Sequence, residues 1–450
     1  MSKNHDIYES PFAERYSSKE MLYNFSADKK FRTWRQLWIA LAEAEKELGL
    51  DISSGQIAEL KRFADKINYE DARVYEEKFK HDVMAHIHAY GKQCPKAKPI
   101  IHLGATSAYV VDNTDLVVMR DGLSLLKKEL INVIKVLAEF AERYADLPTV
   151  AYTHFQPAQF TTVGKRTCLW LQDLVMDLDD IDARLGGLKF LGAKGAVGTQ
   201  ASFLALFDGD ENKVVELDKL VSKKMGFADT FIISGQTYTR KLDMLVLSTL
   251  ASIAQSAHKF SNDLRLLQHL REIEEPFEEE QVGSSAMAYK RNPIKTERIA
   301  SLARLVITFY QNTAMTAANQ WFERTLDDSA GKRISLPEAF LGVDAILNLY
   351  YNIVSGLKVN KSVIAYNVDR ELPFIATENI LMEGVKRGGD RQTLHEKIRR
   401  HAIASIENSK DGSKNDLLKR LNNDKTFSKI RGVLPNMLSR VITLGGRPRR

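Results

Sequence analysis

Cysteine is scarce in this 450-residue chain, which contains only Cys94 and Cys168. Two cysteines cannot form a disulfide framework, and their separation matches no zinc-finger or zinc-ribbon spacing, so we expect reduced thiols. No apolar run reaches the roughly 18 residues that a membrane-spanning helix needs. The first residues also lack the apolar stretch of a secretory signal. We therefore expect a water-soluble, cytoplasmic protein with no membrane partner.

A large excess of one charge is also absent. The chain has 64 basic and 58 acidic residues, a formal net charge of +6, and the two signs are interspersed along most of its length. A protein that binds nucleic acid or another polyanion would need a contiguous basic face, so we expect no nucleic-acid partner. A mild basic excess is equally typical of a protein with one pocket for a small, multiply charged anion.

Glycine and proline are missing from several long segments, and apolar residues recur there every three or four positions. This pattern predicts amphipathic helices over residues 124–147, 237–275 and 294–328, and the similar apolar spacing of residues 338–357, which include Gly342 and Gly356, predicts a fourth. At about 1.5 Å per residue the longest would extend on the order of 55 Å, which is typical of an extended bundle. Strand signals are sparse. We expect an all-α fold whose central bundle is shared between subunits.

The frequency of helix breakers divides the chain into three expected domains. Glycine and proline interrupt the first hundred residues often, which favours a smaller N-terminal domain over residues 1–107. The long-helix bundle follows over 108–359. Shorter helices after Gly356 indicate a C-terminal helical domain over 360–450, which ends in a basic tail that we expect to be frayed.

A segment of about sixteen residues rich in Gly, Ser and Ala separates two of the predicted long helices, which is longer than most connections in bundles. It is either a functional loop or a solvated linker. Glu278 and its acidic neighbours support the second interpretation, because they would keep the segment in contact with water. The pair Asn292-Pro293 predicts a helix start, with the Asn side chain capping free N–H groups. Cations surround this helix start, so it is a favourable place for a carboxylate or phosphate.

The loop itself carries the most specific pattern in the chain. Its sequence, Gly283-Ser284-Ser285-Ala286-Met287-Ala288-Tyr289-Lys290-Arg291-Asn292-Pro293, matches the signature Gly-Ser-Ser-x-Met-x-x-Lys-x-Asn-Pro of the aspartase/fumarase superfamily of lyases. Further matches, from Arg15-Tyr16 to the segment 324–333, cover nearly the whole chain, which resembles the adenylosuccinate lyase family of the animal type.

The resemblance implies a three-domain aspartase/fumarase-like fold, no metal and no cofactor. It implies a homotetramer with active sites built from three subunits, and nucleotides as the small-molecule substrates. The implied reaction is β-elimination of fumarate in purine biosynthesis. Its two substrates are adenylosuccinate, which gives AMP, and succinylaminoimidazole carboxamide ribotide, which gives AICAR.

Such an elimination needs a base for a weakly acidic C–H proton and an acid for the departing nitrogen on the opposite face. The resemblance assigns the base to Ser284 and the acid to His154. A serine is a poor base unaided, so we expect Lys290 and loop N–H groups to stabilise its alkoxide. Without the resemblance, Ser284 would be a turn residue and His154 a partly buried structural ring.

The resemblance also gives His81 a role in contacting substrate and supporting the acid. His81 and His86 lie five positions apart, about 140° around a helix, so no zinc-protease site is expected. We expect His86 and His88 to be structural.

The remaining family matches are polar residues expected to hold the substrate. Those around the succinyl and base portions are Thr106, Ser107, Thr153, Gln236, Lys290 and Asn292. Those that hold the nucleotide phosphate are Arg15, Tyr16, Arg324, Ser329 and Arg333, for which a forked guanidinium is well shaped. Lys80, Asp82 and Arg298 are also expected to contact substrate. The alternatives are a surface ion pair for Arg298 and a plain salt-bridge network of Asp327 and Asp328 with Arg324 or Arg333.

Two departures from the family pattern have predicted effects. Ala288 stands where the signature has Pro, so we predict slower or less complete loop closure. The chain also ends sooner after Leu434 than the family pattern leads us to expect, which would weaken the third domain or the tetramer. Two other functions remain open: another fumarate-releasing lyase, such as one for argininosuccinate, and a catalytically silent helical scaffold. The Arg324 to Arg333 cluster disfavours the first, because an amino-acid substrate has no phosphate.

Overall fold

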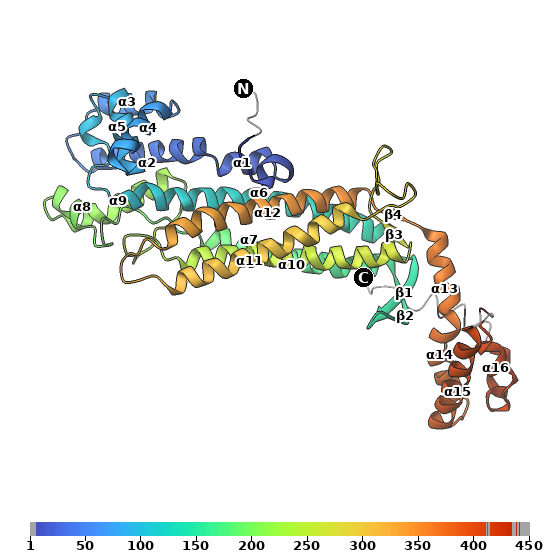
Figure 1. Ribbon diagram of the computed structural model, residues 1–450. Coiled ribbons are helices and arrows are strands. Elements are labelled where there is room, and N and C mark those ends of the chain that lie inside the picture. Colours follow the sequence, from blue (N-terminus) through green and yellow to red (C-terminus); the bar gives the residue numbers. More distant parts are fainter. Residues whose placement is uncertain (1–5, 411, 413–414, 434–437, 439–440, 442–450) are drawn as a thin grey trace. The chain divides into compact units, whose positions relative to one another are not determined.

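The computed structural model describes residues 6–410, 412, 415–433, 438 and 441, and helices dominate it (Figure 1). The all-α prediction is confirmed, because the sheets in these described residues are limited to two antiparallel two-stranded pairs, β1 with β2 and β3 with β4. The chain after Val433, including the expected basic tail and the shortened end, lies outside the described residues except for Leu438 and Val441.

The chain forms two compact units. Unit 1 comprises residues 1–131, 176–258 and 299–349, and unit 2 comprises residues 132–175, 259–298 and 350–450. The unit boundaries fall inside the long helices, which are α6 (Ser107–Arg143), α7 (Val163–Gly187), α10 (Lys241–His269), α11 (Ile294–Ala318) and α12 (Asp328–Ser355). The division into three domains by residue range stays a prediction.

The shorter elements lie within one unit each. Those of unit 1 are η1 (Phe12–Tyr16), α1 (Lys19–Asn24), α2 (Ala27–Glu47), α3 (Ser54–Arg62), α4 (Tyr69–Phe79), α5 (Asp82–Gln93), η2 (Lys98–Ile100), α8 (Ala201–Leu206) and α9 (Glu211–Lys224). Those of unit 2 are β1 (Pro148–Thr153), β2 (Gln156–Thr162), β3 (Ile273–Glu274), β4 (Lys358–Val359), α13 (Lys361–Ile375), α14 (Thr377–Lys386), α15 (Arg391–Ser409), α16 (Leu417–Asn423) and η3 (Lys425–Val433).

The long helices exist as predicted, but several of their ends differ. Helix α6 begins at Ser107 instead of residue 124, because Gly122 is a packing position and does not end the helix. A Cβ at Gly122 would lie 2.9 Å from the ring of Phe340, so only glycine allows this approach of α12. Helix α12 likewise begins at Asp328 and continues through Pro337. This proline removes the ladder hydrogen bond to the Arg333 carbonyl but does not end the helix.

Aromatic rings form much of the core of unit 1. Trp34 and Trp38 of α2 are buried and in edge-to-face contact, and Tyr90 of α5 lies beside Trp38. The ring of His86 stacks on Phe31 at 3.8 Å, and burial lowers the pKa of His86 to about 4. His86 is therefore a neutral core residue, as expected.

The core of unit 2 supports a β-hairpin that the sequence pattern did not predict. Phe260 of α10 stacks on Tyr350 of α12, and Trp170 of α7 packs edge-on against Phe260. Helix α13 packs against both strands of the hairpin. Across the described part of the chain, no helix combines the length and apolarity needed to cross a membrane.

Candidate functional site

The signature loop between β3 and α11 is closed at its base by its own backbone. A Cβ at Gly283 would lie 2.2 Å from the carbonyl oxygen of Lys290, so glycine is required where the two ends of the loop meet. Asn292 Nδ2 donates a hydrogen bond to the Gly283 carbonyl at 2.8 Å. The predicted base and anion holders, Ser284, Lys290 and Asn292, are therefore brought together on one small closed loop.

The hydroxyl of Ser284 lies in a turn formed by this loop. Its Oγ accepts hydrogen bonds from the N–H groups of Met287, at 3.1 Å, and Ala286, at 3.4 Å. Two amide dipoles directed at one oxygen favour the negative charge of an alkoxide. The same geometry is also that of an ordinary serine turn. Lys290 lies on the exposed part of the loop, where its N–H donates to the Met287 carbonyl at 3.0 Å.

The start of helix α11 differs from the prediction. Its free N–H groups are capped by Glu275, whose carboxylate accepts from Lys295 N–H at 3.1 Å and from Thr296 N–H at 2.8 Å. The predicted cap by Asn292 is wrong, because the side chain of Asn292 is turned toward Gly283. The helix terminus does attract a carboxylate, but this carboxylate is the protein's own, from a buried residue beyond β3.

His154 lies at the tip of the hairpin. The two-residue turn His154-Phe155 connects Thr153 to Gln156, and its residues have φ of 52° and 57°. Such turns favour Asn and Gly, so a His-Phe pair stores backbone strain, which tends to persist at functional sites. His154 and the neighbouring Thr153 are exposed. Within the single chain, His154 is therefore not a partly buried ring.

A buried carboxylate fixes the base of this hairpin. Glu272, fully buried, accepts hydrogen bonds from Thr149 Oγ1 of β1 at 3.2 Å and from Asn367 Nδ2 of α13 at 2.9 Å. Arg166 of α7 lies 3.8 Å from the same carboxylate and donates to the Val150 carbonyl. The strained tip therefore projects from a rigid support.

His81 in unit 1 contacts another predicted site residue. His81 is the N-cap of α5, where its Nδ1 accepts the Met84 N–H at 3.4 Å, and its Nε2 lies 3.3 Å from Ser107 Oγ at the start of α6. An accepting Nδ1 leaves the proton of the neutral ring on Nε2, directed at Ser107. Lys80, in left-handed conformation with φ of 54°, makes the bend between α4 and α5. Thr106 precedes Ser107 directly, so these residues form one cluster.

Asp82 connects this cluster to the predicted phosphate holders. Its carboxylate lies 3.9 Å from Lys30 Nζ and 3.8 Å from an Arg333 guanidinium nitrogen. It also accepts the Val83 N–H in the first turn of α5 at 2.8 Å. Asp82 therefore lies between His81 and Arg333.

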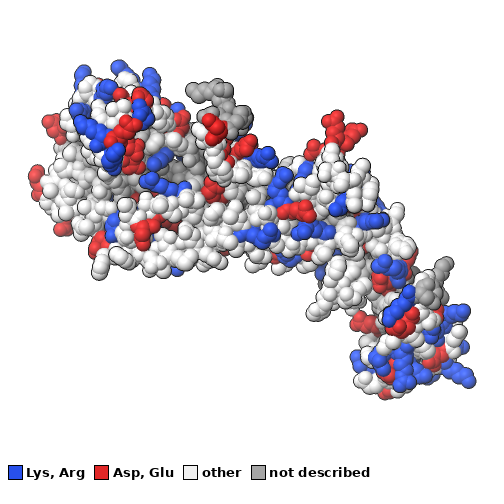
Figure 2. All heavy atoms as spheres, viewed as in Figure 1, with Lys and Arg blue, Asp and Glu red and all other residues white. Residues whose placement is uncertain are grey.

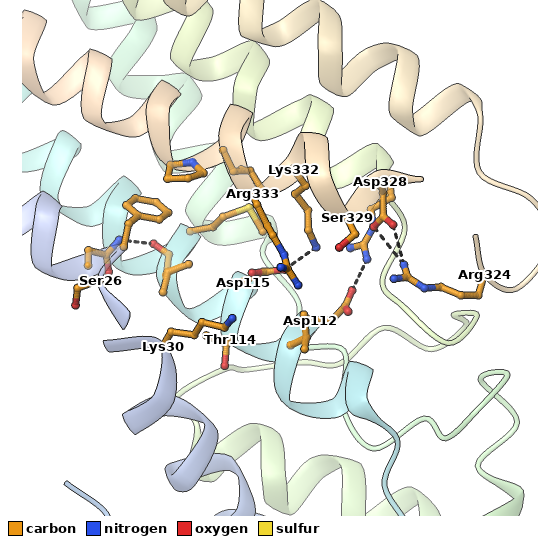
Figure 3. A pocket seen from close by; sticks show the side chains of 18 residues that line it. Ser26, Lys30, Asp112, Thr114, Asp115, Arg324, Asp328, Ser329, Lys332 and Arg333 are labelled. Atoms are coloured by element: carbon orange, nitrogen blue, oxygen red, sulfur yellow. Dashed lines mark hydrogen bonds and ion pairs between the residues drawn. The ribbon is translucent and has the colours of Figure 1, made fainter. Parts of the chain in front are cut away.

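A cavity of about 160 Å³ lies in unit 1 among α1, α2, α6 and α12 (Figure 3). Three of the predicted phosphate holders, Arg324, Ser329 and Arg333, line it. Of the described lining residues, five are cationic and three are carboxylates, so the cavity favours an anion. Sequence reasoning missed Lys30, Arg240 and Lys332, because only the folded chain brings these distant segments together.

Ion pairs order the cations around this cavity. Arg240 pairs with Asp112 at 2.8 Å and with Asp328 at 2.6 Å, and Asp328 also accepts from Arg324 at 3.1 Å. Although burial opposes ionisation, the charges of Arg240, Lys332 and Arg324 together lower the pKa of Asp328. The salt-bridge alternative is therefore correct for Asp328. Asp327 differs, since it accepts from Gln320 at 3.1 Å.

The other predicted site residues lie in several places. Arg15 and Tyr16 end η1, where Arg15 is exposed and Tyr16 contacts Phe12 edge-on. Gln236 donates from Nε2 to the Ala196 carbonyl at 3.0 Å, and its backbone N–H donates to the Glu323 carbonyl beside Arg324. Arg298, half-buried on α11 in unit 2, lines a groove together with Glu278, Glu280 and Lys295.

One chain does not bring the predicted base and acid together within unit 2. In Figure 1 the loop that carries Ser284 and the hairpin that carries His154 protrude on opposite sides of the helices between them. On the face that Figure 2 shows, basic and acidic side chains are interspersed over most of the surface. This distribution does not favour a polyanion-binding protein.

Comparison with known proteins gives consistent results. A family model described as "Lyase" matches residues 10–308, and one described as "Adenylosuccinate lyase C-terminus" matches residues 373–442. The chain is 48% identical to adenylosuccinate lyase of Saccharomyces cerevisiae, over 99% of this chain and 93% of that protein. It is 47% identical to adenylosuccinate lyase of Schistosoma mansoni, over 97% of this chain and 92% of that protein.

Solved structures share the fold. A fumarate lyase from Mesorhizobium sp. BNC1 superimposes with a TM-score of 0.82 and 22% identity, over 97% of this chain and 95% of that one. A 3-carboxy-cis,cis-muconate lactonizing enzyme from Pseudomonas putida gives a TM-score of 0.82 and 22% identity, over 96% and 95% of the two chains. The predicted all-α, fumarase-like fold is confirmed.

Proposed function

The chain belongs to the adenylosuccinate lyase family, and we propose that it eliminates fumarate from adenylosuccinate, which releases AMP, and from succinylaminoimidazole carboxamide ribotide. The observation that carries this proposal is the cavity in unit 1, where Arg324, Ser329 and Arg333 converge in an excess of positive charge. A phosphate dianion is complementary to such a site. An argininosuccinate-type substrate has no phosphate to place there.

The proposed reaction assigns the two proton transfers to separate segments. Ser284 Oγ removes the proton from the succinyl carbon, the electron pair forms the double bond of fumarate, and the bond from carbon to nitrogen breaks. His154 gives a proton to the departing nitrogen from the opposite face. The amide groups of Ala286 and Met287 support the first step, because they already donate to Ser284 Oγ.

The other site residues bind and orient the substrate in this proposal. Lys290 and Asn292 hold the carboxylate on which negative charge grows, and Thr106, Ser107, Thr153 and Gln236 surround the succinyl and base portions. His81 supports the acid, and Lys80, Asp82 and Arg298 contact substrate. Arg15 and Tyr16 join the cavity residues at the phosphate. The proposal needs no metal and no cofactor.

We further propose a cytoplasmic homotetramer with composite active sites. The separation of the Ser284 loop and the His154 hairpin within unit 2 supports sites completed by other subunits. Exposed apolar side chains on the loops of unit 1 support a subunit interface there. These side chains are Ile232, Ile233, Trp321, Phe322 and Leu326. A catalytically silent scaffold would not need the Ser284 loop and the His154 hairpin of different subunits to meet.

The test is fumarate release from adenylosuccinate, with argininosuccinate as the competing substrate. We expect activity only with adenylosuccinate, and losses of at least about a thousandfold for Ser284→Ala and His154→Ala. Full activity in both variants would refute the assignment of base and acid. Co-refolding the two inactive variants should restore about a quarter of wild-type activity if each site takes the two residues from different subunits. Sites within one chain would give none.

A further inference from the structure

The segment that carries Arg15 and Tyr16 lies along helix α12 of unit 1. Ser10 Oγ donates to Glu338 Oε2 at 3.3 Å, and Ser17 Oγ donates to the Leu341 carbonyl at 3.0 Å. Between them, the buried ring of Phe12 packs on Gly342, where an added Cβ would lie 3.5 Å from Phe12 Cζ. The segment is therefore fastened to α12 on both sides of Arg15.

Asp344 makes the strongest of these attachments. Its carboxylate accepts two hydrogen bonds from Ser18, one from the backbone N–H and one from Oγ, each at 2.6 Å. Asp344 is fully buried, and hydrogen bonds to a buried carboxylate are stronger than those between neutral groups. Ser18 is also the N-cap of α1, since its Oγ accepts the Met21 N–H. Asp344 therefore fixes the point, two residues after Tyr16, where η1 ends and α1 begins.

A second carboxyl group, Glu129 of α6, lies against Asp344. Burial, and then the neighbouring Asp344 carboxylate, raise the pKa of Glu129 to about 9. Glu129 is therefore a neutral acid at pH 7 and hydrogen-bonds to Asp344. Asp344 therefore has two neighbours, Glu129 of α6 and Ser18, and its carboxylate accepts both donors of Ser18.

Helix α12, which carries Asp344, also carries two of the proposed phosphate ligands, Ser329 and Arg333, in its first turns. Asp344 lies about three turns further along, on the order of 16 Å from Arg333. Helix α12 is continuous over this distance, although Pro337 removes one ladder hydrogen bond, so a residue attached at Asp344 keeps a defined position relative to Arg333. Fixed positions matter because binding costs less free energy when the side chains that hold the phosphate are already ordered.

We propose that Asp344 is a positioning residue for phosphate binding, which through Ser18 holds the Arg15–Tyr16 segment in register with Ser329 and Arg333. This inference rests on the proposed function, which assigns the nucleotide phosphate to these residues. Asp344 does not touch the substrate in this role. It acts through the segment that it fastens.

The test compares adenylosuccinate with the corresponding nucleoside, which lacks the phosphate, using Asp344→Asn and Ser18→Ala. For Asp344→Asn we expect KM for adenylosuccinate to rise about tenfold, kcat to change less than twofold, and kcat/KM for the nucleoside to stay unchanged. Ser18→Ala keeps the backbone donor, so its KM should rise about threefold. Ser18→Thr retains the hydroxyl and should restore wild-type KM.

Asp177→Asn is the matched control. Asp177 of α7 is a buried carboxylate of unit 1 that accepts a serine hydroxyl, from Ser252 of α10, at 2.6 Å. It should lower the melting temperature without a phosphate-dependent rise in KM. Equal losses on both substrates for Asp344→Asn, or no loss, would overturn the positioning role. A wild-type enzyme that treats both substrates alike would overturn the phosphate assignment as well.

Discussion

Asn292 and Gly283 lie nine residues apart, and the Nδ2 of the first donates to the carbonyl of the second at 2.8 Å. This bond joins the two ends of the loop that carries Ser284. The backbone at Gly283 passes so close to Lys290 that a methyl group cannot fit between them. The loop therefore behaves as one closed element, whose internal geometry depends on a glycine and an asparagine outside the reacting groups.

Gly283→Ala is expected to open this loop. The added Cβ would have to move the Lys290 backbone, and with it the turn that directs amide groups at Ser284. We expect kcat to fall at least about tenfold, with a small change in melting temperature because the affected contacts lie within the loop. Steady-state kinetics and thermal unfolding measure the two effects. Gly186→Ala is the control, because a Cβ there meets none of the described residues within 4 Å, and it should leave kcat unchanged.

Ala288→Pro is expected to favour the ordered loop. The Lys290 N–H donates to the Met287 carbonyl at 3.0 Å, so Ala288 is the second residue of a β-turn, where proline is preferred. Proline restricts the open loop, which favours the ordered loop by about 0.4–1 kcal/mol. The ratio of ordered to open loop would therefore rise roughly two- to fivefold. Limited proteolysis of the loop should slow accordingly. Unchanged proteolysis and turnover would contradict the predicted effect of alanine at this position.

Ala286→Pro provides the contrast. The N–H of Ala286 donates to Ser284 Oγ at 3.4 Å, and proline would remove this donor while also stiffening the loop. Turnover should therefore decrease for Ala286→Pro and not for Ala288→Pro. A similar decrease in both would mean that the loop tolerates no proline and that the amide at 286 has no special role.

Glu45 gives a pH-dependent prediction about stability. It is fully buried in α2, neither carboxyl oxygen has a hydrogen-bond partner among the described residues, and burial raises its pKa from 4.5 to about 9. The folded state therefore holds a proton that the unfolded state releases, so stability is highest below about pH 4.5 and decreases as pH rises toward 9. At pH 7 the difference is on the order of 3 kcal/mol.

Glu45→Gln should remove this dependence. The variant is expected to be more stable than wild type at pH 8 and similar to it at pH 4.5, as measured by urea unfolding across this range. Glu142→Gln, at an exposed position of α6, is the control and should be neutral at both values. Equal stability of Glu45→Gln and wild type at pH 8 would show that Glu45 finds a partner or water in solution.

Asp328→Asn is expected to destabilise the protein strongly. Asp328 pairs with the buried Arg240 at 2.6 Å and with Arg324 at 3.1 Å, and its loss leaves buried positive charge with less compensation. A loss of about 3 kcal/mol is typical of such a change. Urea unfolding measures it. The adjacent Asp327→Asn, at an exposed position, should cost under about 0.5 kcal/mol.

The sequence predicted those features that depend on neighbours along the chain. Periodic apolar residues gave the long helices, and the signature gave the loop with Ser284 and Lys290. Gly122 and Pro337 led to wrong predictions of helix ends. The sequence does not reveal that Phe340 packs on Gly122 or that α12 tolerates Pro337. The preference of Asn for helix N-caps also predicted Asn292 as the cap of α11, whereas the observed cap is Glu275.

Convergence of distant segments could not be predicted. Lys30, Arg240 and Lys332 are ordinary charged residues in the sequence. Only the packing of α2, α12 and the segment just before α10 gathers them around one cavity. The hairpin under His154 was missed for a similar reason. Its strands are stabilised by Glu272 and Asn367, which lie more than a hundred residues downstream, and by packing on α13.

The opposite placement of the Ser284 loop and the His154 hairpin has a genetic consequence. In the proposed assembly a chain with a damaged loop still supplies an intact hairpin to a neighbour, and a chain with a damaged hairpin still supplies an intact loop. Two defective alleles of these different kinds would therefore complement each other in a heterozygote. Two alleles damaged in the same segment would not.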